Sequence, residues 1–166
     1  MSEIPVLIKR RLQADVIWPV YEEMVNELGE EKAQVILDTA IRKAAIAEAG
    51  EFAGKAPGGR TSMRSFIDLF EHWTAGGALE VEVTLESDQQ FDFDVTRCRY
   101  AEAYHEMGIA HIGHLLSCNR DGAFCEGYDS KLKLHREQTI MSGASRCTFR
   151  YRYEAGDASI QNAANN

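Results

Sequence analysis

The first half of the chain places its apolar residues with the period of an α-helix. Residues 8–28 follow this spacing, and Pro19 predicts a kink or a restart because proline lacks the N–H that a helix interior uses. Residues 30–52 predict the clearest helix, whose apolar stripe comprises Ala33, Ile36, Leu37, Ala40, Ile41, Ala44 and Ala47. A glycine-rich loop then leads to a third helix, which Thr61 or Ser62 can cap.

The pattern changes to strict alternation at Leu79. Val81, Val83 and Leu85 alternate with polar residues, which predicts a half-buried strand, and residues 91–96 predict its antiparallel neighbour. Further elements are predicted at 98–107 and 109–117, both helical, and at 132–140 and 146–153, which form a second hairpin.

This order of elements predicts the fold class. Helices followed by hairpins are typical of an α+β protein, with N-terminal helices packed on a small antiparallel sheet made of two hairpins. Residues 1–154 are predicted to form one domain. Residues 155–166 are small and polar, and we expect them to be a disordered tail.

Composition narrows the class of partner. The chain has 166 residues, 45% of them hydrophobic, and a formal net charge of −8. An acidic surface disfavours nucleic acid, whose phosphates require clustered lysine and arginine, but it leaves room for a small-molecule substrate. No stretch reads as a signal peptide or a membrane span, so we expect a cytoplasmic protein without a membrane partner. The amphipathic helices could also pack on a second copy, which would make a homo-oligomer.

Four cysteines in a cytosolic chain favour thiols or ligands over disulfides. Cys118 precedes Asn119 and Asp121, either of which could cap a helix, and it adjoins Arg120. A helix N-terminus and a nearby cation both favour a thiolate, which is the nucleophilic form. Asp121 follows by three residues, so on a helix its carboxylate would lie on the same side as the thiol.

The other cysteines have weaker local arguments. Cys98 is predicted at a helix start between Arg97 and Arg99, which again favours a thiolate. Strand periodicity places Cys147 inward with aromatic residues, where a small core residue is as good a reading as a chemical role. Cys125 lacks a capping or charged neighbour, and we interpret it as structural.

Arg136 falls on the inward face of strand 132–140 and therefore needs a partner. That partner could be a substrate carboxylate or a protein acid such as Asp121, and the ion pair within the protein is slightly favoured. His111 and His114 would share a helix face, but this spacing is a weak metal signal and an ordinary amphipathic face is the better interpretation.

No cofactor is expected from these motifs, because the chain lacks a CxxC pair, a phosphate-binding loop and a GxSxG elbow. A divalent metal held by Cys98, Cys118 and Cys147, with a histidine or water as fourth ligand, stays open as an alternative. In that case a metal-bound water could be the nucleophile.

The ordered set of these residues resembles the L-2-amino-thiazoline-4-carboxylic acid hydrolase family over roughly residues 5–153. The resemblance is carried by Val95-Thr-Arg-Cys98, Cys118-Asn-Arg-Asp121, Leu134-His-Arg136, Gly143 and Arg146-Cys147-Thr-Phe149 in the second half, and by Trp18-Pro-Val-Tyr21 in the first. An acidic residue often follows the last cysteine of the family pattern, where this chain has Thr148.

The resemblance implies a hydrolase that opens a small heterocycle, cyclic amidine or imide at a C–N or C=N bond. In our interpretation Cys118, Asp121 and Cys98 are the candidate catalytic residues, with Cys118 as nucleophile and Asp121 as proton carrier. The candidate substrate-binding residues are Arg136, Cys147, His111 and His114. The alternative is a non-enzymatic small-molecule or metal-binding module that uses the same cluster of Cys98, Cys118 and Cys147.

Overall fold

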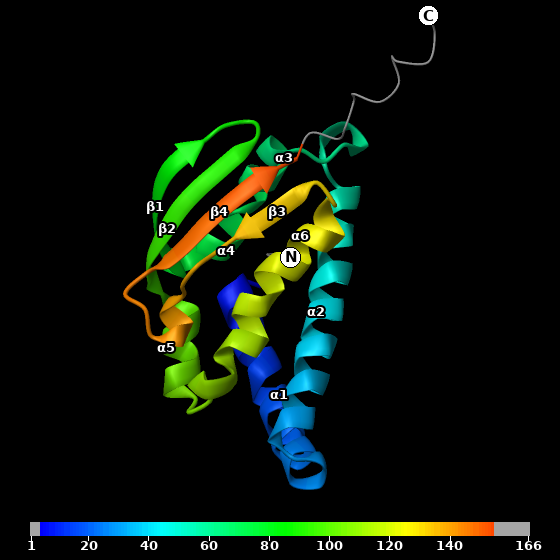
Figure 1. Ribbon diagram of the computed structural model, residues 1–166, viewed down its shortest axis with the longest axis vertical. Helices are drawn as coiled ribbons and strands as arrows, with labels where there is room; N and C mark the ends of the chain where they lie inside the picture. Colours follow the sequence, from blue (N-terminus) through cyan, green and yellow to red (C-terminus); the bar gives the residue numbers. More distant parts are fainter. Residues whose placement is uncertain (1–3, 155–166) are drawn as a thin grey trace, which may run out of the picture.

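The computed structural model describes residues 4–154, and it has the predicted α+β architecture (Figure 1). The predicted tail at 155–166 lies outside the described residues. The α-helices are α1 (Val6–Leu28), α2 (Glu30–Gly54), α3 (Met63–Leu69), α4 (Glu71–Thr74), α5 (Arg99–Glu106) and α6 (Asn119–Tyr128). The strands are β1 (Leu79–Glu86), β2 (Gln90–Cys98), β3 (Leu132–His135) and β4 (Cys147–Tyr153).

The four strands form one antiparallel sheet in the order β1-β2-β4-β3. The hairpin β1–β2 and the hairpin β3–β4 join where β2 pairs with β4, in a register that sets Phe93 opposite Phe149 and Val95 opposite Cys147. The prediction of two hairpins in one small sheet is therefore confirmed.

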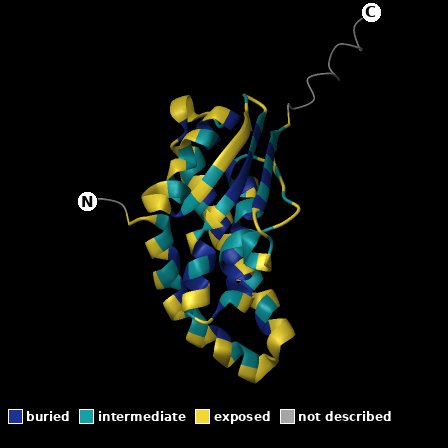
Figure 2. Ribbon diagram, turned by 90° about the vertical axis from the view of Figure 1, so that its left-hand side faces the viewer, coloured by how far each residue is buried: buried dark blue, intermediate teal, exposed yellow. Residues whose placement is uncertain are grey.

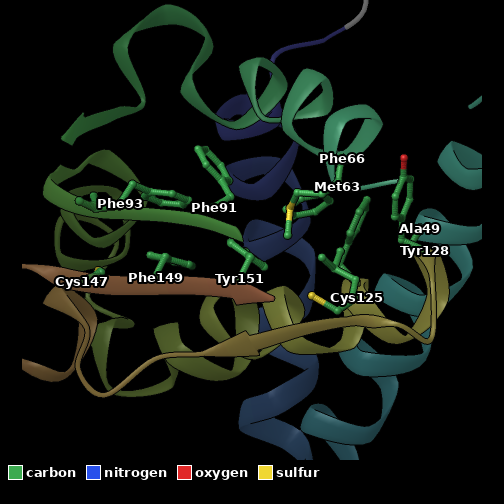
Figure 3. Close-up of a cluster of buried hydrophobic side chains, with 13 residues drawn as sticks. Ala49, Met63, Phe66, Phe91, Phe93, Cys125, Tyr128, Cys147, Phe149 and Tyr151 are labelled. Atoms are coloured by element: carbon green, nitrogen blue, oxygen red, sulfur yellow. The ribbon is translucent and has the colours of Figure 1, made fainter. Parts of the chain in front are cut away.

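The two faces of the sheet differ as alternation requires. The outer face carries ion pairs between neighbouring strands, in which Asp94 accepts hydrogen bonds from Arg146 at 3.0 Å and from Arg150 at 2.9 Å, and Asp92 binds Arg152. The inner face is apolar and packs against helices α3, α4 and α6. Figure 3 shows its two rows of side chains, one along β2 and one from Cys147 to Tyr151 along β4.

The buried hydrophobic residues form two clusters. Figure 2 colours buried residues of the ribbon dark blue. The first cluster lies between the sheet and helices α3 and α6. The second joins α1 and α2 to α5 and to the helical turns η3 (Ala110–Ile112) and η4 (His114–Cys118). The candidate site lies where these two clusters meet.

Helices α2 and α6 cross closely at Gly127. A Cβ built on Gly127 would lie 2.2 Å from the carbonyl oxygen of Ile46, which is closer than any side chain tolerates. The glycine therefore lets the α6 backbone approach α2 and fixes how α6 presents its other face to the sheet.

The structure corrects two predicted boundaries in the helices and strands. α1 runs from Val6 to Leu28 without restarting at Pro19, whose ring is exposed to solvent, while Ala14 and Tyr21 hold the helix by burial on its inner face. Strand β3 ends at His135 and does not continue to Ile140. Residues 136–139 leave the sheet, and a short 3₁₀ turn, η5 (Ile140–Ser142), replaces the predicted end of the strand.

A third correction concerns the segment before α6. The predicted helical stretch 109–117 is present as η3 followed by η4, but η4 is a π-helical turn that runs directly into α6. The backbone of Cys118 is itself helical, with φ −62° and ψ −36°. Cys118 therefore lies inside a continuous helical segment. Because the η4 turn precedes it directly, α6 has no free N-terminus beside the Cys118 thiol.

Among residues 4–154, no helix is both long enough and apolar enough to cross a bilayer.

Candidate functional site

A cavity of about 90 Å³ lies between the inner face of the sheet and helices α1, α5 and α6. A space of this size holds several water molecules or a small ligand. Its walls are mainly aromatic, and they include Phe66, Phe70, Trp73, Tyr100, Phe124, Phe149 and Tyr151.

Five of the seven site residues predicted from the sequence line this cavity. Cys98 reaches it from the end of β2, Cys118 and Asp121 from the start of α6, Arg136 from the segment after β3, and Cys147 from β4. Residues separated by up to 49 positions in the chain are thus brought to one space. These five residues place a few polar groups in a lining that is otherwise mainly apolar, which is typical of small-molecule sites.

Arg136 and Asp121 form the polar centre of the cavity. The Arg136 Nη1 donates to Asp121 Oδ2 at 2.5 Å, and its Nη2 donates to the Cys118 carbonyl oxygen at 3.0 Å. The guanidinium carbon also lies 5.0 Å from the centre of the Phe149 ring, within cation–π range. The favoured reading of the sequence, an ion pair with Asp121, is what the structure contains.

The Asp121 carboxyl is partly buried beside the cavity. Burial raises its pKa above the ordinary value of a carboxyl group, and the positive charge of Arg136 only partly offsets this effect. Its side chain is 27% exposed, so the cavity gives access to it. A partly accessible carboxyl with a raised pKa is the type of group that serves as a general acid or base.

The surroundings of Cys118 do not favour the thiolate that the sequence predicts. Burial, and after it the Asp121 carboxylate, raises the pKa of the Cys118 thiol to about 12, although Arg136 opposes the shift. The helix dipole gives no help because η4 continues into α6 without a free N-terminus. Arg120 does not approach the thiol as expected, since its Nε donates to the Leu116 carbonyl oxygen at 2.9 Å.

Cys98 likewise differs from the sequence prediction. It is the residue before the first turn of α5, as expected, but burial raises the pKa of its thiol to about 11. Arg97 points to Glu102, with Nε to Oε1 at 2.7 Å, and Arg99 binds the Gly76 carbonyl oxygen, so neither supplies the expected activating charge.

Cys147 is buried on the inner face of β4, as strand periodicity predicts (Figure 3). Burial raises the pKa of its thiol, and its Sγ accepts a hydrogen bond from the backbone N–H of Ile140 at 3.2 Å. This bond fixes η5 over the cavity. Cys125 is buried and donates to the Asp121 carbonyl oxygen at 3.3 Å, in agreement with the structural role inferred for it.

The two histidines lie away from the cavity. His111 and His114 are exposed, and His111 contacts the edge of Trp18 at a centroid distance of 5.5 Å. Their predicted substrate-binding role is therefore not supported by their position, because η3 and η4 turn these side chains outward. Over the described chain, no three histidine, cysteine or acidic side chains are grouped closely enough to hold a metal ion, the three cavity thiols included.

Sequence reasoning missed two buried arginines of the cavity. Arg10 on α1 and Arg120 on α6 are 5% and 8% exposed, and both line the same space as Asp121. The helical period contains a signal for the first of them. Arg10 is aligned with Ala14 and Tyr21 at steps of four and seven, on the inward face of α1.

Taken together, the described residues form an α+β fold with a small cavity, which is lined by a carboxyl group, a paired arginine and three thiols among other residues. The model of the L-2-amino-thiazoline-4-carboxylic acid hydrolase family matches residues 9–151. The chain belongs to this family, as the resemblance in the sequence indicated.

Two solved structures are also similar to this chain. The phenol-responsive sensory domain of the transcription activator PoxR, bound to phenol, superimposes with a TM-score of 0.52 at 13% identity, covering 83% of this chain and 73% of that one. A trafficking protein particle complex subunit 3 from Naegleria fowleri, covalently bound to palmitic acid, gives a TM-score of 0.49 at 14% identity and covers 89% of this chain and 96% of its own. Comparison with curated proteins gives no significant match.

Proposed function

We propose that this protein is a hydrolase that opens a small cyclic amidine or related heterocycle at a C–N bond, with Cys118 and Asp121 as its catalytic residues. The observation that carries the proposal is the meeting of Cys118, Asp121 and Arg136 in one small cavity of a chain that belongs to this hydrolase family. The proposed partner is a small-molecule substrate, in keeping with the size of the cavity.

In the proposed first step the Cys118 sulfur attacks the electrophilic carbon of the C=N bond. Because the resting thiol is protonated, Asp121 takes its proton during the attack and passes it to the substrate nitrogen. The ring C–N bond then breaks, the departing nitrogen leaves as an amine, and the substrate carbon stays attached to sulfur as a thioimidate. Arg136 keeps Asp121 oriented through this transfer.

Water completes the reaction in the second step. It adds to the thioimidate carbon with Asp121 as general base, the C–S bond breaks, and the proton returns to the Cys118 sulfur. The net change is the addition of one water molecule to an amidine, which gives an amide and an amine on one opened chain. Cys98 and Cys147 line the pocket in this account.

Two variants test the roles separately. Asp121→Asn keeps the shape of the side chain but cannot accept a proton, and we expect turnover to fall by about 10²–10⁴-fold. Cys118→Ala removes the proposed nucleophile and should abolish a covalent adduct detectable by intact-protein mass spectrometry. Unchanged turnover in a folded Cys118→Ala protein would contradict the covalent route and leave Asp121 acting on water directly.

A second candidate function is a small-molecule binding module without turnover. It is favoured by the aromatic lining of the cavity and by the shared fold with a domain described as sensing phenol. This alternative predicts saturable binding of small aromatic or heterocyclic compounds with no product. Product formation under saturating ligand would contradict it.

A further inference from the structure

Two buried arginines from different helices face the cavity and share one carboxylate. Arg10 Nη2 donates to Glu48 Oε2 at 2.9 Å, and Arg120 Nη1 lies 3.5 Å from the same oxygen. The other Glu48 oxygen accepts from Lys9 Nζ at 2.8 Å on the solvent side. A single carboxylate therefore faces three cations, two of which are more than nine-tenths buried.

The rest of the cavity compensates this excess of positive charge only in part, because Asp121 is the one further acidic residue that lines the cavity in the described chain. Arg136 and Asp121 neutralise each other through their hydrogen bond. Arg10 also donates from Nη1 to Gln13 Oε1 at 3.0 Å, so each of its two Nη groups has one acceptor. Arg120 uses only Nε, toward Leu116, and its two Nη groups make no hydrogen bond within residues 4–154.

Among the described residues, the Nη groups of Arg120 are not fully enclosed by protein atoms, and Arg120 lines the cavity, so an anion in the cavity could accept hydrogen bonds from them. The burial of Arg120 and the charge of Arg10 together lower the pKa of Arg120 to about 10. The guanidinium stays charged at neutral pH and keeps free donors. A planar fork with free donors suits a carboxylate or a similar small oxyanion.

We infer that Arg120, supported by Arg10, forms an anion-binding subsite that holds the carboxylate of the ligand at the helical end of the cavity. The inference revises the role expected of Arg136, which is already paired to Asp121 and is a positioning residue for it. For the identity of the ligand ring it rests on the proposed function, but the subsite itself depends only on the arginines.

The test compares two unreactive probes that differ in charge, 2-aminothiazole-4-carboxylate and its carboxamide, by isothermal titration. The wild-type protein should bind the carboxylate at least about tenfold more tightly, the scale of one charge-assisted hydrogen bond. In Arg120→Gln that preference should fall to within about threefold. This variant relieves the crowding of Arg10 and Arg120, so we expect it to fold.

Two further variants sharpen the result. Arg120→Lys keeps the charge but loses the fork, and it should retain only part of the preference. Arg42→Gln removes an exposed arginine that pairs with Glu126 on the surface, and its preference should equal that of the wild type. Equal binding of the two probes by the wild type, binding of neither, or an unchanged preference in Arg120→Gln would each overturn the subsite.

The binding titrations test the anion-binding subsite separately from the proposed hydrolase activity. A protein that prefers the carboxylate probe but never opens a ring keeps the subsite and loses the hydrolase proposal. A protein that opens cyclic amidines equally well with a carboxylate or a carboxamide keeps the hydrolase proposal and loses the subsite.

Discussion

Replacement of Arg136 by methionine removes the ion pair at the centre of the cavity while keeping a side chain of similar length. The variant loses the 2.5 Å hydrogen bond to Asp121, the 3.0 Å bond to the Cys118 carbonyl oxygen and the contact with Phe149. Removal of one partner of a fully buried ion pair lowers the free energy of unfolding by about 3–5 kcal/mol. The cost should be smaller here because the Asp121 side chain is 27% exposed. We therefore expect a loss of about 2–3 kcal/mol in the free energy of unfolding at neutral pH.

The loss should depend on pH in a definite direction. Burial already raises the pKa of Asp121 in the folded protein, and removal of Arg136 raises it further. A carboxyl with a raised folded-state pKa reduces stability as the pH rises above its unfolded value, and it has no such effect once it is protonated in both states. The difference between Arg136→Met and the wild type should thus be largest at about pH 7.5 and smaller at about pH 4.

Urea unfolding at both pH values measures this difference, with Arg97→Met as the matched control. Arg97 forms exposed pairs with Glu80 and Glu102, so its removal should change the free energy of unfolding by no more than about 1 kcal/mol, with little dependence on pH. A loss below about 0.5 kcal/mol for Arg136→Met, equal at the two pH values, would refute the reasoning.

Three further outcomes are expected. Cys118 in the folded, ligand-free protein should react slowly with iodoacetamide near neutral pH, because burial and Asp121 raise the pKa of its thiol to about 12. Rapid alkylation of Cys118, followed by mass spectrometry, would contradict this expectation. Gly127→Ala should destabilise the protein by about 1–3 kcal/mol in thermal or urea unfolding, since the new methyl would meet the Ile46 carbonyl oxygen, and a neutral effect would count against the close crossing. Replacement of His111 and His114 by alanine should leave ligand affinity within about twofold in a binding titration, because both are exposed outside the cavity, and a larger loss would return them to the site.

The α+β fold and the two hairpins could be predicted from the spacing of the apolar residues. They recur every three to four residues in the helices and every two residues in the strands. The inward position of Cys147 follows from that alternation alone. The strand end after His135 could not be predicted, since alternation continues through residues 136–140 while the backbone leaves the sheet. There the Arg136 side chain binds Asp121 from a loop and not from a strand.

The residues that line the site could be predicted more readily than the charges around their side chains. Local sequence around Cys118 indicates a helix start and a nearby cation, but a π-helical turn fills the preceding positions. Whether Arg120 points toward the thiol or toward Glu48 depends on the packing of α6 against α2, which no local pattern records. The family resemblance identified the ordered residues, and the fold determined which of them meet.

We propose that the cavity is a site of ring-opening hydrolysis in which Asp121 carries protons. The most direct measurement incubates the purified protein with small cyclic amidines that bear a carboxylate and follows the products by mass spectrometry. We predict a ring-opened product heavier than the substrate by one water molecule, formed by the wild type and lost in Asp121→Asn. Tight binding of the same compounds without any such product, or equal product from Asp121→Asn, would contradict the account.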